Sequence, residues 1–107
     1  MKLIIEIVSN DDSSAVNANL TEHGFMVTKL STTGGFLRAG NTTFIIGTDD
    51  DKVENAIELI KEESKKRTEV IPATASFDIN KYAAYPVEVQ VGGATIFVLD
   101  VEQFIKA

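Results

Sequence analysis

Hydrophobic positions follow two different periods along this chain, and they predict strands and helices in alternation. Residues 3–8 are apolar on both sides of a strand except at Glu6, which places this strand in the middle of a sheet. Residues 25–30 and 42–46 are rich in β-branched and aromatic side chains and predict two further strands. Helical spacing of buried positions is seen in two stretches, at Val16 and Leu20 and at Val53, Ala56, Ile57 and Ile60.

A hairpin is predicted near the C-terminus. Val87, Val89 and Val91 alternate with polar residues, and a second apolar segment covers residues 94–99. Gly92 and Gly93 separate the two segments, and a two-residue hairpin turn favours glycine because both positions need positive φ. The order is strand, helix, strand, strand, helix, strand, with an added C-terminal hairpin strand. It predicts an α+β domain of the ferredoxin-like, split βαβ arrangement.

The ends of the predicted helices carry capping residues. Asn10, Asp11 and Asp12 precede the first helix, and Gly24 is placed to end it. His23 lies in the last turn, where it would interact with the helix dipole or with solvent. Residues 49–51 are three aspartates before the second helix; they favour capping over a Ca²⁺ loop, which would need a glycine and a distal glutamate. We therefore expect no metal site.

Two connections are longer than the fold needs. The first is a glycine-rich loop at about residues 31–41, and the second is a long segment at about residues 67–86. The first has more turn residues than a tight hairpin needs, and a connection as long as the second is usually a binding loop or a lid in a compact domain. Residues 101–106 predict a short terminal helix or a tail held by Phe104 and Ile105.

Composition limits the function classes. The 107 residues suit one domain, and the absence of cysteine excludes disulfides and thiolate chemistry. A net charge of −6 disfavours binding to nucleic-acid polymers and to anionic membrane, and the N-terminal apolar run is too short for a signal peptide or a membrane span. One histidine and acids that suit helix caps give no nucleophile–base pair, so no catalytic residue and no enzyme activity are predicted. The expected location is the cytoplasm.

The glycine-rich loop carries the candidate chemistry. Gly34, Gly35 and Gly40 would let backbone N–H groups approach phosphate oxygens. Phe36 would stack on a base, and Arg38 and Asn41 would bind a phosphate and an amide-like base edge. The structural alternative is a glycine-rich connection whose Phe36 packs into the core.

Two segments, TTGGFLRAGNTTF and PVEVQVGGATIFV, resemble those of the PII-like receptors of the second messenger cyclic di-AMP, and the likeness runs along the whole chain. The resemblance implies a homotrimer that binds the nucleotide between subunits, needs no cofactor, and signals to a downstream protein through its loops. Carried over by motif, it assigns ligand contacts to seven residues: Thr28, Gly35, Phe36, Leu37, Asn41, Gly47 and Phe97.

Each carried-over residue has a physical role under this resemblance. Phe36 and Leu37 would hold an adenine, and Asn41 would pair with its N6/N7 edge. Gly47 would offer backbone groups to a base edge, and Thr28 a hydroxyl to phosphate. Phe97 is also a candidate core residue, because an aromatic side chain in a last strand is more often buried than in contact with a ligand.

Two positions depart from the family pattern. Members that bind the nucleotide usually carry an arginine where this chain has Met26, and a glutamine where it has Lys106. With Arg38, these residues are candidates for altered contacts. The alternative function is therefore a PII-like interaction protein that has lost or changed its nucleotide. A relation to the ATP-binding PII proteins is a further alternative, although their partner-binding loop is longer.

Overall fold

The computed structural model describes residues 1–30, 40–71 and 87–107, with the side chains of Ile71 and Val87 left out. Along the chain the elements are β1 (Lys2–Ser9), α1 (Asn10–Glu22), β2 (Val27–Leu30), β3 (Asn41–Thr48), the 3-10 turn η1 (Asp50–Lys52), α2 (Val53–Ser64), β4 (Arg67–Ile71), β5 (Val87–Val91) and β6 (Ala94–Asp100).

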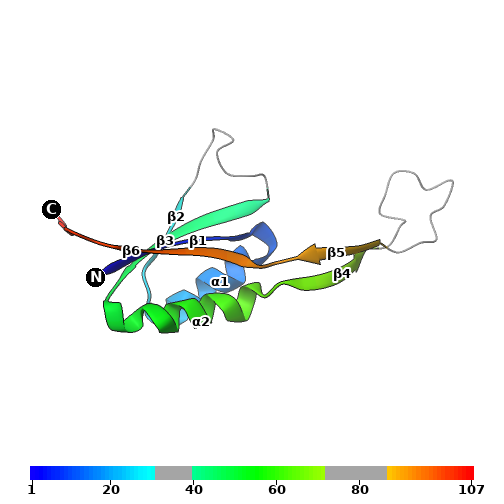
Figure 1. Cartoon of the computed structure of the whole chain (residues 1–107), viewed down its shortest axis with the longest axis horizontal. Helices are drawn as coiled ribbons and strands as arrows, with labels where there is room; N and C mark the ends of the chain where they lie inside the picture. The colour runs from blue at the N-terminus through cyan, green and yellow to red at the C-terminus, as the bar shows by residue number, and fades with distance from the viewer. Residues whose placement is uncertain (31–39, 72–86) are drawn as a thin grey trace.

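Four strands form an antiparallel sheet in the order β2-β3-β1-β6. Both helices lie against one face of this sheet (Figure 1). The ferredoxin-like prediction is confirmed, and β1 is a central strand, as its two apolar sides indicate. The second sheet is a two-stranded arm made of β4 and β5, which projects from the body.

The core lies between the helices and the sheet. It contains alternate residues of the two central strands, such as Ile4, Val8 and Ile46, packed against α1 and α2. The predicted positions Val16 and Leu20 of α1 are fully buried, as are Ala56 and Ile60 of α2. The residues of the fully buried α1 stripe are spaced by four, and Asp12 continues this stripe toward the helix start.

The ends of α1 follow the sequence signals closely, whereas before α2 the predicted capping is not seen: Asp49, at the N-cap of η1, makes no side-chain capping hydrogen bond. Ser9, and not Asn10, is the N-cap of α1, and its Oγ accepts a hydrogen bond from the Asp11 backbone N–H. At the other end, Gly24 has φ +90° and its N–H donates to the Thr21 carbonyl, as expected after a helix C-terminus. The His23 ring Nδ1 lies 2.7 Å from the Asn19 carbonyl oxygen.

The predicted turn at Gly92–Gly93 is wrong. β5 pairs with β4, and β6 pairs with β1, so the two strands on either side of the glycines do not pair with one another. Both glycines have positive φ, +83° and +88°, but they form a bend between two strands that continue in nearly the same direction (Figure 1). Residues 67–71, predicted as the start of a long loop, form β4.

The last residues, 101–107, continue past β6 as a tail without a helix. Phe104 and Ile105 are exposed and do not hold the tail against the body. Within the described part of the chain, no helix has the length and apolar character needed to cross a membrane.

Candidate functional site

Four of the carried-over residues lie on one face of the main sheet. Thr28 pairs with Ile45, which pairs through β1 residue Ile5 with Phe97. Directly opposed residues in an antiparallel sheet share a face, so Thr28 and Phe97 point to the same side. Asn41 and Gly47 stand at even spacing from Ile45 on β3, and therefore share this side too.

This side is the one that α1 and α2 leave uncovered, and we call it the open face. Ile4, Val8 and Ile46, which pack on the helices, belong to the opposite side. The open face is formed by Leu3, Ile5, Ile7, Thr28, Leu30, Asn41, Thr43, Ile45, Gly47, Thr95, Phe97 and Leu99.

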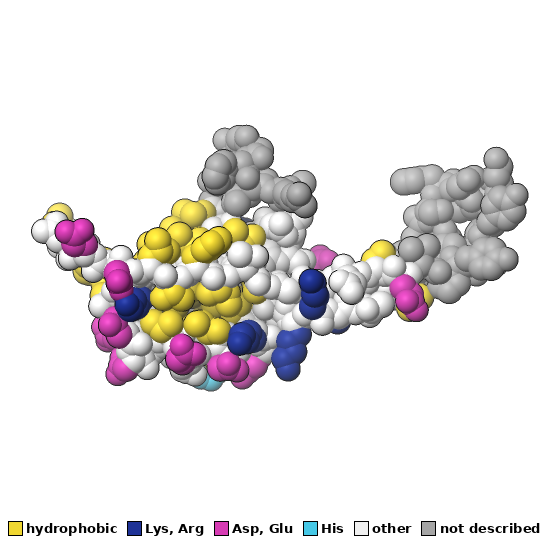
Figure 2. All heavy atoms as spheres, in the orientation of Figure 1, with side chains coloured by type: hydrophobic (Ala, Val, Ile, Leu, Met, Phe, Trp, Pro, Cys, Tyr) yellow, Lys and Arg dark blue, Asp and Glu magenta, His cyan; other side chains and the backbone are white. Residues whose placement is uncertain are grey.

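The open face is largely apolar, although this chain is strongly acidic overall. Phe97 is 53% exposed, and Leu30 and Leu99 are also exposed. Figure 2 shows hydrophobic side chains gathered on the body around β6, while the charged side chains gather along α2. An apolar sheet face of this kind marks an interaction surface. The alternative prediction, a core position for Phe97, is wrong, because this side chain is half exposed among the described residues.

Asn41 and Gly47 lie at opposite ends of β3. They are six positions apart in extended chain, which corresponds to about 20 Å. Each end of the strand borders its own cavity. The two residues therefore belong to different parts of the open face within one protomer.

The cavity at the Asn41 end has a volume of about 400 Å³. Its polar lining comes from Ser9, Asn41, Lys66 and Thr95, together with the backbone at Gly92 and Gly93. This set offers an amide, two hydroxyls and one ammonium group, which suit the polar edge of a base or an anionic group.

The cavity at the Gly47 end has a volume of about 380 Å³. Met26 lines it and is 81% exposed, beside Gly47 and Phe25. Its polar side comes from His23, Thr48, Asp49, Lys52 at the end of η1, and Asn55 in the first turn of α2. Met26 contributes a thioether at this position, which is a weak acceptor and carries no charge.

The remaining predicted contacts lie in the glycine-rich loop and in the C-terminal tail. Gly35, Phe36, Leu37 and Arg38 lie outside the described residues, together with the alternative placement of Phe36 in the core. Lys106 is exposed in the tail beyond β6.

The start of β3 is bound to the start of α1. The Asn10 backbone N–H donates to the Gly40 carbonyl at 2.8 Å, and the Thr42 hydroxyl donates to the Asn10 side-chain carbonyl at 2.5 Å. Gly40 has φ +95°, a conformation that favours glycine. These contacts attach both neighbours of Asn41 to the first residue of α1.

An ion pair that the sequence interpretation missed lies near this cavity. Asp12 is buried, and its carboxylate accepts two hydrogen bonds from the Arg67 guanidinium, at 2.8 and 3.4 Å. These hydrogen bonds raise the pKa of Arg67 above its ordinary value. The signal was available, because Asp12 stands four residues before Val16 on the buried stripe of α1, where a carboxylate needs a cationic partner.

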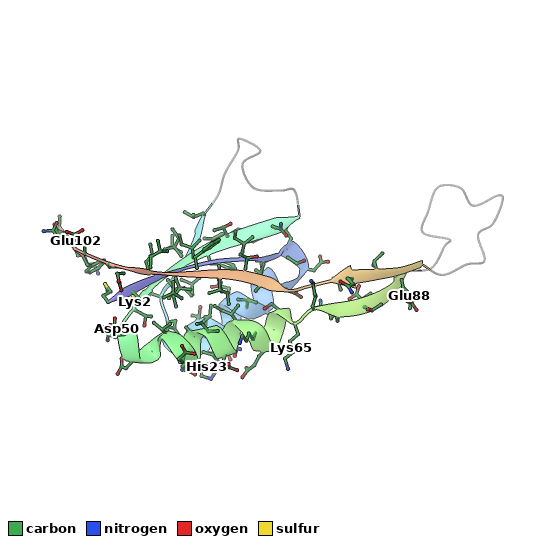
Figure 3. All side chains as sticks on the ribbon, viewed as in Figure 1. Lys2, His23, Asp50, Lys65, Glu88 and Glu102 are labelled. Carbon is green, nitrogen blue, oxygen red and sulfur yellow. The ribbon has the colours of Figure 1, made fainter. Side chains whose placement is uncertain are left out.

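The acidic residues before α2 are used for local pairing. The N-terminal ammonium lies 2.9 Å from the Asp50 carboxylate and lowers the pKa of Asp50. Lys2 pairs with Asp100 at the same end of the molecule, and Figure 3 shows Lys2 and Asp50 at this end. Among residues 1–30, 40–71 and 87–107, no three acidic or histidine side chains are grouped to hold a metal ion.

Comparison with known proteins finds a match over the full length. A family model described as cyclic-di-AMP receptor matches residues 1–107. A crystal structure of a functionally unknown protein from Pediococcus pentosaceus ATCC 25745 is similar to this chain with a TM-score of 0.77 and 40% sequence identity. The similarity covers 99% of this chain and 96% of the other.

Proposed function

Because this chain belongs to the cyclic-di-AMP receptor family, we propose that it binds cyclic di-AMP between the subunits of a homotrimer. Binding would order the loops next to the site and so change the surface offered to a downstream protein. The observation that carries the proposal is the common placement of Thr28, Asn41, Gly47 and Phe97 on the open face. These four residues come from three strands, and one uncovered surface contains them all.

The separation within that set supports a site shared by two protomers. Asn41 and Gly47 are about 20 Å apart along β3, and each borders a cavity of its own. A small dinucleotide would contact both Asn41 and Gly47 if the Asn41 end of one protomer faced the Gly47 end of the next. The apolar side chains of the open face supply the contact area that such an assembly needs.

The chemistry of the set suits a nucleotide better than an extended polyanion. Asn41 presents an amide at the mouth of its cavity and would pair with the N6/N7 edge of adenine. Lys66 brings the ammonium group to the same cavity. Phe97 offers an exposed ring, and base–aromatic stacking contributes about 1–3 kcal/mol per base.

Calorimetric titration tests the proposal. We expect binding heat with cyclic di-AMP and none with cyclic di-GMP or ATP at the same concentration. Asn41→Ala should weaken binding about tenfold or more, because a bidentate contact to adenine is lost. Asn17→Ala, at an exposed asparagine on α1, is the matched control and should leave affinity unchanged. Absence of heat at high micromolar cyclic di-AMP would contradict the proposal.

A second candidate is a PII-like interaction protein that has lost or changed its nucleotide. The observation favouring it is Met26, which is exposed in the cavity next to Gly47 and carries no charge for a phosphate. Lys106, in the tail, places a positive charge elsewhere. Under this candidate the same titration gives no heat with cyclic di-AMP, while the subunits still assemble.

A further inference from the structure

The first turn of α1 is bound to two separate parts of the molecule. On one side, the side-chain carbonyl of Asn10 accepts a hydrogen bond from the Thr42 hydroxyl, and its backbone N–H donates to the Gly40 carbonyl. Thr42 is buried, whereas Asn10 and Gly40 are exposed, so these hydrogen bonds lie at the edge of the core. The residue between these two partners is Asn41, which pairs with Ser9 in the register of β1 and β3.

On the other side, two residues further along the same turn, Asp12 binds the arm. Its carboxylate accepts hydrogen bonds from both terminal nitrogens of Arg67, the first residue of β4. Arg67 also donates to the Lys65 carbonyl at 3.1 Å. Figure 3 places Lys65 where α2 ends and the arm begins. The Asp12–Arg67 pair therefore lies at the base of the arm.

The other strand of the arm is packed onto this pair. A Cβ atom on Gly92 would lie 2.5 Å from the Lys65 carbonyl oxygen and 2.6 Å from an Arg67 guanidinium nitrogen. It would also lie 3.3 Å from the Asp12 carboxylate. Only a glycine allows the β5–β6 bend to approach the pair this closely. The Gly93 backbone N–H also donates to the Ser64 carbonyl, so the bend is attached both to the end of α2 and to the Asp12–Arg67 pair.

The cavity at the Asn41 end lies between the two attachments. Ser9 and Asn41 line it from the β3 side, and Gly92 and Gly93 line it from the arm side. A group in this cavity would lie between Asn41, whose neighbours are bound to Asn10, and Gly92, which packs on Arg67. The two attachments are joined by three consecutive residues of one helical turn, Asn10–Asp12.

We propose that the first turn of α1 couples the start of β3 to the β4–β5 arm, with Asp12 and Arg67 as positioning residues that transmit contacts at Asn41 to the arm. The inference rests on the proposed function for the identity of the ligand, but the coupling is a property of the unliganded chain. Asn10 holds one side of the turn and the Asp12–Arg67 pair holds the other. A shift at Gly40–Thr42 therefore moves the base of the arm.

Hydrogen exchange of the unliganded full-length chain tests the coupling. Asp12→Asn removes the charge-assisted pair, and amides of β4 and β5 should exchange about tenfold faster. Thr42→Val removes the hydroxyl that binds Asn10, and the same amides should exchange about threefold faster, although Thr42 does not touch the arm. In the double variant the Thr42→Val effect on the arm should disappear, because the connection is already broken.

Glu69→Gln is the matched control. Glu69 Oε1 lies 3.7 Å from the Arg67 Nε, so this variant removes a carboxylate next to the same guanidinium and keeps the Asp12 pair. It should leave arm exchange within the error of the wild type. Arg67→Lys is the second disrupting variant if Asp12→Asn folds poorly, since it retains the charge and loses the two-point contact. The coupling would be overturned if arm exchange in Thr42→Val were unchanged. It would also be overturned if the increases in arm exchange rate from Thr42→Val and Asp12→Asn multiplied in the double variant.

Adding cyclic di-AMP separates the coupling from the proposed function. We expect the saturated wild type to exchange more slowly in β4 and β5, and Asp12→Asn to bind without this protection. If Asp12→Asn binds and its arm responds as in the wild type, the coupling is wrong. If calorimetry shows no binding, the proposed function fails, and the exchange cycle of the unliganded variants still decides the coupling.

Discussion

Glu6 is a buried carboxyl group in the middle of the core. It lies between Phe44 and Ile96 on the helix-covered face of the sheet, and it is fully buried. Neither of its side-chain oxygens has a hydrogen-bond partner among the described residues. This burial raises the pKa of Glu6 to about 7. In the sequence, Glu6 stands out as the one charged residue within the apolar stretch 3–8. The pattern alone did not show that its side chain faces the helices.

The stability of the fold should fall as pH rises through the range set by Glu6. Above its unfolded pKa, near 4.5, the unfolded chain loses this proton while the folded chain keeps it, so unfolding is favoured up to about pH 7. The difference corresponds to about 3 kcal/mol. Glu6→Gln should remove most of this decline, and urea unfolding at pH 5 and pH 8 would measure it. An identical decline in Glu6→Gln would contradict the assignment, and exposed Glu63→Gln is the control.

Met26 departs from the residue that the family resemblance leads us to expect, and we predict that it affects ligand affinity. It is exposed, lines the cavity beside Gly47, and offers no positive charge to a dianionic nucleotide. Met26→Arg should strengthen binding of cyclic di-AMP about tenfold or more, because a charge-assisted hydrogen bond contributes roughly 1.5–3 kcal/mol. Calorimetric titration measures the change, and Met26→Gln is the uncharged control. An affinity that stays the same would place the phosphates away from this cavity.

At the level of elements, the glycine pair at residues 92–93 shows what local sequence determines. The prediction that both positions need positive φ is correct. The pairing inferred from it is wrong, because β6 finds its partner in β1 and β5 finds its partner in β4. These partners are distant in sequence, and a two-residue motif carries no information about them. The strands and helices of the body were predictable because their periodicity reflects burial along each element.

Gly92 and Gly24 allow the cost of the junction to be measured. Both have positive φ, near +90°, but a Cβ at Gly24 would meet nothing within 4 Å, whereas one at Gly92 would meet Lys65 and Arg67. Gly24→Ala should cost about 1 kcal/mol from the backbone alone. Gly92→Ala should cost about 2–4 kcal/mol, since the pair at the arm base must also move. Denaturant unfolding compares the two, and equal costs would show that Gly92 is not closely packed.

The candidate site was predictable only in part, because its members gather through the sheet and not along the chain. Thr28 and Phe97 are far apart in sequence and lie in one row across four strands. The resemblance supplied these residues, and the fold explains why they share a surface. Asp12 was interpreted as a capping residue, since its partner Arg67 belongs to a strand that the sequence indicated only weakly.

At the level of the whole molecule, the open face is the sheet surface that α1 and α2 leave uncovered. We expect the protein in solution to have about three times the 11.6 kDa mass of one chain, as the family resemblance implies. Phe97→Glu places a charge on β6, the edge strand of the open face, and should shift the mass toward that of one chain, because an unpaired charge would be buried on assembly. Analytical ultracentrifugation measures the mass over a range of concentrations.

Val70→Glu is the matched control for this change, because Val70 is 58% exposed, close to the 53% of Phe97, but lies on the arm. It should leave the assembly intact. If the wild type has the mass of a single chain, or if the two variants dissociate it equally, the open face is not where subunits meet. Cyclic di-AMP binding that survives in a monomeric Phe97→Glu protein would further show that Asn41 and Gly47 do not act together across an interface.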